Sequence, residues 1–202
     1  MSNSAPLVVL ALDLAKNRSG WAVGSPGWKR PFWGIFELAG EWDRHEGKRL
    51  HDFREFLARK CSEHSVTYIA IERFFINIKD FDFAGTTPIA QMHGIAMEYA
   101  HSQGIRCGSV AIGSWRSHFL GTSVAPKHLA SKQRTAFWKE MAVKACVQRN
   151  LYVTFHDEAE AIGIMDYALA CLDPDYEHKT GPASRRAELK AETAAFRGES
   201  LL

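Results

Sequence analysis

Four acidic residues stand where a globular protein does not usually bury a charge. Asp13 and Glu72 each end a short apolar run, VVLALD and YIAIE. Asp157 and Glu160 lie three residues apart in TFHDEAEAIGIMDYALACL, a stretch with the spacing of an amphipathic helix. On that helix both acids share a face with Ile164, although carboxylates normally stay off the apolar side. We infer that this face contacts metal ions rather than water.

Four carboxylates without cysteine ligands make a hard oxygen site, which suits Mg²⁺ or Mn²⁺ and argues against zinc. Such a site can hold two ions about 3.5–4 Å apart, one activating a water and the other stabilising the leaving oxygen of a phosphodiester. If the strands that end in Asp13 and Glu72 are parallel neighbours, a divalent metal between the acids compensates their repulsion. The sequence therefore predicts a divalent-metal site formed by Asp13, Glu72, Asp157 and Glu160, of a kind that can act on a phosphodiester.

Each acid taken alone also has an ordinary explanation. Asp13 can be a turn residue, and Asp157 can cap a helix, where the dipole favours an acid in the first turn. Glu72 can pair with Arg73 or Lys79. The metal hypothesis therefore rests on the four acids as a set.

Three further residues near this motif have more than one interpretation. His156, beside Asp157, can be a metal ligand, a proton relay or a residue at the boundary of the site. Asp166 falls about half a turn round the helix from Asp157, so we assign it to solvent or to a structural salt bridge. Lys132 can contact the scissile phosphate or its neighbour as a catalytic residue, or it can simply be solvated.

The positive charge of the chain is local. The formal net charge of the 202 residues is +2, yet residues 106–149 hold eight Lys or Arg and the single acid Glu140. Such a segment is a candidate surface for a polyanion, although a solvated helix face explains these runs more often.

The four cysteines form no C-x-x-C pair, which predicts reduced thiols. Without a signal-peptide pattern or an apolar run of about 20 residues, we expect a cytoplasmic protein that makes no membrane contact.

Strand and helix patterns alternate along the chain. Strands are expected at 7–12, 19–24, 32–38, 68–72 and 107–112, and helices at 44–64, 87–103, 131–149 and 154–172. Short connections join the first three strands, which are therefore expected to be antiparallel. The alternation predicts an α/β domain with a mixed sheet over residues 1–172. Residues 173–202 are polar and Ala-rich, and we expect a tail that is disordered or marginally helical.

Taken in order, these pieces resemble the RuvC-like Holliday junction resolvases of the ribonuclease H-like superfamily. LALDLAKNRSGWAVG resembles the first two strands of that family and places its first acid at Asp13, and YIAIERFF resembles its I-E-x-x-F stretch, with Glu72. AQMHGIAMEYA is similar to the Gln-x-x-Gly-x-Ala helix that follows. SWRSHFLGTSVAPKHLASKQR is similar to the basic segment of the family, and HDEAEAIGI to its closing D-x-x-D-A motif.

The resemblance implies a five-stranded mixed sheet, with the first three strands antiparallel, flanked by helices. It implies a homodimer that binds branched DNA and resolves four-way junctions by paired symmetric nicks, with two Mg²⁺ or Mn²⁺ ions per site and no organic cofactor. Such compact variants look like the resolvases of bacteriophages. The residues expected to contact DNA are Phe74, Phe75, Lys79, Arg116, Lys127, Lys132 and Arg134.

The sequence departs from the family pattern at two site positions. Glu160 stands where the family usually has Asp, so its carboxylate reaches one methylene further. Arg116 stands where Lys is usual. The first departure leaves open which metal ion the site prefers.

Aromatic residues near these motifs are divided between DNA and the core. Of Phe74 and Phe75, we expect one to stack on an unpaired base at the branch point and the other to pack under the next helix. Trp115 and Trp138 are expected in the core.

Other functions stay open at this stage. A ribonuclease H-like nuclease acting on other branched DNA or on RNA/DNA hybrids would keep the same fold and metals. A non-catalytic DNA-binding module with a degenerate site is hinted at only by Glu160. A sugar-kinase or actin-like ATPase is disfavoured, because LAKNRSG after Asp13 lacks a glycine-rich phosphate loop.

Overall fold

A five-stranded sheet forms the centre of the structure, a computed structural model that describes residues 5–38, 42–74, 83–173 and 175–176. The strands are β1 (Val9–Asp13), β2 (Arg18–Gly24), β3 (Phe32–Glu37), β4 (Tyr68–Glu72) and β5 (Arg106–Val110), in the order β3-β2-β1-β4-β5. The β1–β2 and β2–β3 pairs are antiparallel, and the β1–β4 and β4–β5 pairs are parallel. The predicted mixed sheet is confirmed.

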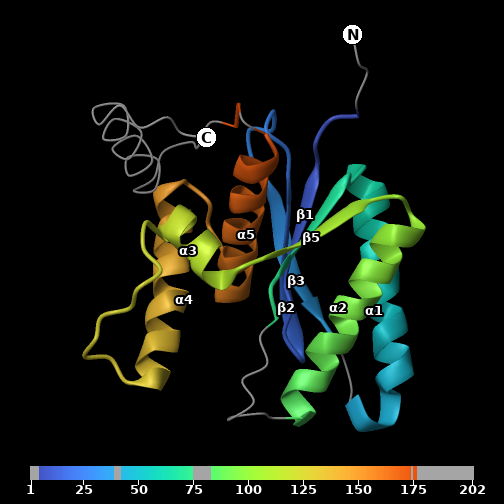
Figure 1. The fold of residues 1–202 in the computed structure, drawn as a ribbon, viewed down its shortest axis with the longest axis horizontal. Helices are drawn as coiled ribbons and strands as arrows, with labels where there is room; N and C mark the ends of the chain where they lie inside the picture. The colour runs from blue at the N-terminus through green and yellow to red at the C-terminus, as the bar shows by residue number, and fades with distance from the viewer. Residues whose placement is uncertain (1–4, 39–41, 75–82, 174, 177–202) are drawn as a thin grey trace, which may run out of the picture.

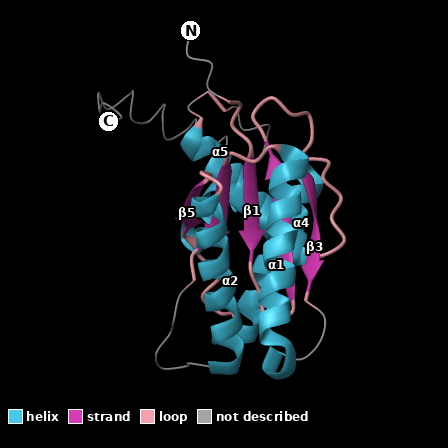
Figure 2. Cartoon of the chain, turned by 90° about the vertical axis from the view of Figure 1, so that its right-hand side faces the viewer, coloured by secondary structure: helices cyan, strands magenta, loops and turns pink. Residues whose placement is uncertain are grey.

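Helices cover both faces of this sheet. The described residues form α1 (Trp42–His64), α2 (Phe83–Ser102), α3 (Ile112–Leu120), α4 (Ser131–Gln148) and α5 (His156–Leu172). Figure 1 shows α1 and α2 on one side of the sheet and α3, α4 and α5 on the other. Figure 2 looks onto the α1 and α2 side, with β1 visible between the two helices. Over the described part of the chain, none of the helices has the length and apolar character needed to span a bilayer.

The central strand β1 is buried on both sides because its side chains alternate between two cores. Val9 and Ala11 pack in the core beneath α3, α4 and α5, and Leu10 and Leu12 pack in the core beneath α1 and α2. All four residues are at most 1% exposed. The continuous apolar run in the sequence is therefore that of a strand covered by helices on both faces.

One helix was not predicted. The strand expected at 107–112 ends at Val110, and α3 begins two residues later. This helix has nine residues and turns only Trp115, Phe119 and Leu120 into the core, too few repeats to give a periodic pattern. It ends at Gly121, whose φ of 75° is the left-handed conformation common at helix C-termini.

The start of α2 also differs from the prediction. Helix α2 begins at Phe83 rather than at residue 87, although Pro88 lies inside it. Pro88 is buried, so the packing of α2 on the sheet outweighs the hydrogen bond that a proline removes. Of the expected tail at 173–202, residues 174 and 177–202 lie outside the described residues.

Main-chain atoms of α5 lie directly against β2. A Cβ atom at Gly20 would stand 1.9 Å from the carbonyl oxygen of Asp157 and 2.4 Å from its carbonyl carbon. A change of rotamer cannot relieve this contact, because the atoms of Asp157 that it involves are main chain. Gly20 also pairs with Asp13 in the β1–β2 ladder. Glycine at position 20 therefore sets how closely the helix with Asp157 approaches the strand with Asp13.

Gly20→Ala is expected to destabilise the protein by about 1–3 kcal/mol, because α5 or β2 must shift to admit the methyl group. The measurement is urea unfolding followed by circular dichroism. Gly47→Ala is the control, since Gly47 is exposed on α1 and a Cβ there meets no atom within 4 Å. That variant should be neutral or slightly more stable, because alanine favours the helix. Equal stability of the two variants would contradict the close contact at Gly20.

Candidate active site

The acids that end β1 and β4 lie next to each other at one end of the sheet. The β1–β4 ladder is parallel, and its last residue pair immediately precedes Asp13 and Glu72, as predicted. Burial raises the pKa of Asp13 well above its ordinary value, and the charges of Glu160, Glu72 and Asp157 raise it further. Asp13 is thus at the centre of a crowded group of carboxylates.

Helix α5 brings in the second pair of acids through its first turns. Asp157 is 8% exposed. The helix start is capped by Glu158, whose Oε2 accepts hydrogen bonds from the main-chain N–H of Thr154 at 2.7 Å and of Phe155 at 2.9 Å. The capping role considered for Asp157 is therefore filled by Glu158, which leaves the Asp157 carboxylate for the site.

Glu72 and Glu160 complete the cluster of acids. Burial raises the pKa of Glu72, although Trp115 Nε1 donates a hydrogen bond of 2.7 Å to its Oε1. Burial also raises the pKa of Glu160 to about 7, and the charge of Glu72 adds to this effect. Of the partners considered for Glu72, Arg73 is exposed and Lys79 lies outside the described residues. Carboxylates in this state favour the binding of protons or cations at neutral pH.

Arg116, predicted as a DNA contact, lies against the acids. Its Nη2 is 3.6 Å from Glu160 Oε1, and its side chain is 15% exposed. The guanidinium carbon lies 4.7 Å from the ring centroid of Trp138 and 5.4 Å from that of Trp115. Both tryptophans are buried, as predicted. The two departures from the family pattern, Glu160 and Arg116, are therefore in direct contact with each other.

Arg18 is a site residue that the sequence analysis missed. It is the first residue of β2, and its Nε lies 2.7 Å from Asp157 Oδ2. Its guanidinium carbon stands 4.5 Å from the ring centroid of Phe155. The sequence carries no sign of this pairing, because 139 positions separate Arg18 from Asp157.

Lys139 is a second residue that was not singled out. It lies on α4, and its Nζ is 2.7 Å from His156 Nε2. His156 Nδ1 is in turn 2.6 Å from Asp157 Oδ1. Burial lowers the pKa of His156, and Lys139 and Arg18 lower it further against the opposing effect of Asp157. The excess of basic residues in 106–149 pointed to this helix, but it did not single out Lys139 as the residue that contacts His156.

The donor atoms of this cluster fit a hard divalent cation. Ligand atoms of His156, Asp157 and Glu160 all lie within 4.8 Å of one another. Asp13 and Glu72 belong to the same group, since the charges of Glu72 and of the acids of α5 raise the pKa of Asp13 and the charge of Glu72 raises that of Glu160. Four carboxylates and an imidazole form an oxygen-rich set that suits Mg²⁺ or Mn²⁺.

The other residues expected to contact DNA are spread over the surface. Lys127, Lys132 and Arg134 are exposed, and Arg134 Nε donates to the carbonyl of Leu129. Lys132 lies seven residues before Lys139 on α4, about two turns away along the same face. Phe74 is half-buried with its ring centroid 5.9 Å from that of His93. Phe75 and Lys79 lie outside the described residues.

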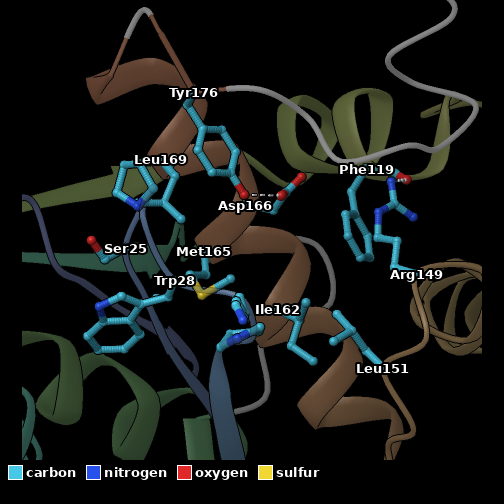
Figure 3. Close-up of a pocket in the computed structure, with 14 residues that line it drawn as sticks. Ser25, Trp28, Phe119, Arg149, Leu151, Ile162, Met165, Asp166, Leu169 and Tyr176 are labelled. Atoms are coloured by element: carbon cyan, nitrogen blue, oxygen red, sulfur yellow. Dashed lines mark hydrogen bonds between the residues drawn. The ribbon is translucent and has the colours of Figure 1, made fainter.

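Asp166 is buried in a separate polar cluster further along α5. Its Oδ1 accepts a hydrogen bond of 2.7 Å from the Tyr176 hydroxyl, and its Oδ2 lies 3.2 Å from His118 Nε2. Figure 3 shows Asp166 and Tyr176 facing each other beside Arg149 and Phe119. With 8% exposure, Asp166 is not a solvent residue, and of the two assignments only the structural one agrees with its position.

Comparison with known proteins shows the fold. The sequence matches no family model and none of the curated proteins. The structure of Thermus thermophilus RuvC matches with a TM-score of 0.56 at 13% identity, over 79% of this chain and 91% of RuvC. T. thermophilus RuvC in complex with a Holliday junction substrate gives 0.55 at 13% identity, over 79% and 90%. The yeast mitochondrial Holliday junction resolvase Ydc2 gives 0.50 at 14% identity, over 83% and 80%. The predicted ribonuclease H-like fold is confirmed.

Without divalent metal, Glu160 should make stability fall as pH rises. The folded state raises the pKa of Glu160 from 4.5 to about 7, so it binds this proton more tightly than the unfolded state does. The resulting stability is fully present below about pH 4.5 and is lost as pH rises through about 7. Between these limits we expect wild type in chelator to lose up to about 3 kcal/mol more than Glu160→Gln, which keeps only the losses due to the other acids.

Urea unfolding at several pH values, with and without Mg²⁺, measures this difference. Mg²⁺ should restore the stability of wild type at high pH more than that of Glu160→Gln. Glu140→Gln is the control, because the Glu140 side chain is 65% exposed on α4. If the free energy of unfolding depends on pH in the same way for wild type and Glu160→Gln, the pKa of Glu160 is not raised in the folded state.

Proposed function

We propose that this chain is a metal-dependent endonuclease that resolves four-way DNA junctions by paired symmetric nicks. The observation that carries the proposal is the convergence of Asp13, Glu72, Asp157 and Glu160 at the ends of two parallel strands and one helix. The chain shares its fold with RuvC and with the yeast mitochondrial Holliday junction resolvase, and one of the RuvC structures contains a Holliday junction. Fold alone does not fix function, so the site carries the argument.

The four carboxylates would hold two Mg²⁺ or Mn²⁺ ions, with His156 as a further ligand or a neighbour. When bound, such ions supply an activated water and stabilise the leaving oxygen of the phosphodiester. The protein fixes two of the carboxylates in advance: Trp115 Nε1 holds Glu72 Oε1, and Arg18 Nε holds Asp157 Oδ2. Orienting ligands in this way lowers the cost of assembling the site.

The surrounding cations reduce the repulsion between the acids and DNA. Arg116 and Lys139 lower the pKa of Glu160 against the effect of burial. Lys139 also lowers the pKa of Asp13. A phosphate approaching the cluster therefore meets a group whose negative charge is partly compensated. Lys127, Lys132 and Arg134, exposed before and along α4, would extend this positive surface toward the arms of a junction.

Paired nicks require two sites that act on opposite strands. A four-way junction has near two-fold symmetry, and a homodimer with one site per subunit matches that symmetry. We therefore include a second copy of this chain in the proposal.

Cleavage of a labelled synthetic four-way junction, beside a linear duplex of matched sequence, tests the function. Wild type with Mg²⁺ or Mn²⁺ should place symmetric nicks on the junction alone, and chelator should prevent them. Asp157→Asn should lower cleavage more than about 100-fold, because it removes a charged ligand. The same variant should bind the junction as well as wild type or better, because it repels phosphate less.

Asp52→Asn is the matched control, since Asp52 lies on α1 and forms its ion pair with Lys48 at the surface. It should cut like wild type. Cutting by Asp157→Asn at the wild-type rate would overturn the metal-site assignment. Junction binding without any cutting would indicate a non-catalytic module, and cutting of flaps or RNA/DNA hybrids in place of junctions would keep the chemistry but change the substrate.

A further inference from the structure

An open groove of 660 Å³ lies beside the acid cluster. One wall is the connection between β1 and β2, with Lys16, and the first residue of β2, Arg18; the other includes Lys139 of α4. His156 and Asp157 stand where the groove reaches the acids. Of the residues expected to contact DNA, those that the structure describes do not line this groove.

Arg18 has donors to spare in this groove. Its Nε is engaged by Asp157, and the ring of Phe155 lies against the guanidinium plane. Among the described residues, no hydrogen bond or ion pair involves its two terminal nitrogens. The side chain is 35% exposed, and a guanidinium presents four N–H groups on those nitrogens. Such a fork matches the geometry of a phosphate group.

The connection between β1 and β2, residues 14–17, leads directly into Arg18 and is held in place by several hydrogen bonds. Ser19 Oγ accepts from the main-chain N–H of Ala15 at 3.1 Å and donates to its carbonyl at 3.2 Å. The carbonyl of Asn17 accepts from the N–H of Leu38 at 2.9 Å. Arg49, 1% exposed, lies with its Nη2 3.5 Å from Asn17 Oδ1. Arg18 therefore projects from a preorganised support, which limits the entropy lost when it binds a ligand.

The charges that line the groove favour an anion. Lys16, Arg18 and Lys139 face two acids, Asp157 and Glu37. Arg18 already compensates Asp157, and three cations stand against two acids among the lining residues that the structure describes. A groove that begins at a nuclease site and carries cations on both walls suits a chain of phosphates.

We infer that Arg18 binds the phosphate next to the scissile one while it holds Asp157 in place, so that the cut strand runs between the β1–β2 connection and α4. The inference rests on the proposed function and deepens it by naming the path of the strand. Because Nε of Arg18 lies 2.7 Å from Asp157, its terminal nitrogens reach the phosphate neighbouring the site rather than a distant one. Arg18 is both a positioning residue and a phosphate contact.

A chemical double-mutant cycle tests this contact. Junctions carry a single neutral methylphosphonate at each of several linkages on either side of the cut, and binding is measured by fluorescence anisotropy in the cleavage-deficient Asp13→Asn background. Arg18→Gln should weaken binding to the unmodified junction roughly ten-fold. At the linkage next to the cut, the methylphosphonate should reduce the affinity of the parent protein by a similar factor. It should not reduce the affinity of Arg18→Gln any further. The slope of log affinity against log salt should also fall by about one phosphate.

Arg59→Gln is the matched control, since Arg59 lies exposed on α1 across the sheet. It should show the same loss as its parent at every linkage. Arg18→Lys keeps the charge without the fork and should recover only part of the affinity. The phosphate contact is disproved if Arg18→Gln keeps the melting temperature of its parent and, at every linkage, loses the same factor of affinity to the methylphosphonate as its parent does.

The proposed function and this contact can fail separately. The same cycle is measured on the matched linear duplex. Equal affinity of the parent for duplex and junction would count against junction resolution, yet coupling at one linkage would still support the Arg18 contact. Preference for the junction without coupling at any linkage would support the function and overturn the inference.

Discussion

Repulsion among four carboxylates at one end of the sheet is the constraint that the surrounding structure has to offset. Burial raises the pKa of Asp13, Glu72 and Glu160, and the charges of neighbouring acids raise the pKa of Asp13 and Glu160 further. Cations from β2 and α3 contact the acids, and Lys139 of α4 contacts His156 beside Asp157. The cap of α5 is supplied by Glu158, so Asp157 is not needed for that role. A divalent cation can therefore replace proton binding as the means of holding the cluster together.

The central parts of the fold and site followed from local signals in the sequence. The apolar run that ends in Asp13 identified a buried strand, and a second such run placed Glu72 beside it, because parallel strands end at the same edge. The cations could not be found in this way. Arg18 and Lys139 reach the acids through contacts between distant elements, and their own sequence neighbourhoods resemble those of many surface residues. Helix α3 was not predicted either, because its nine residues give too few helical repeats to form a periodic pattern.

The two positions at which the sequence departs from the pattern that it resembles lie in contact in the structure. The longer carboxylate of Glu160 lies 3.6 Å from the guanidinium of Arg116. A guanidinium is a broad donor and stacks on aromatic rings, which a lysine ammonium does less well. Trp138 and Trp115 provide those rings. Two substitutions that look independent in the sequence therefore belong to one contact, and each makes physical sense only beside the other.

Trp115 joins three parts of the molecule through one side chain. Its indole N–H binds Glu72, its ring lies beside Arg116, and a Cβ at Gly163 of α5 would stand 2.8 Å from its Cε3. The ring is fully buried, so bulk water does not quench it directly. An intrinsic fluorophore thus touches a carboxylate of the cluster. Changes in the charge of that carboxylate can be followed optically in the unlabelled protein, with the difference between wild type and Trp115→Phe isolating the signal.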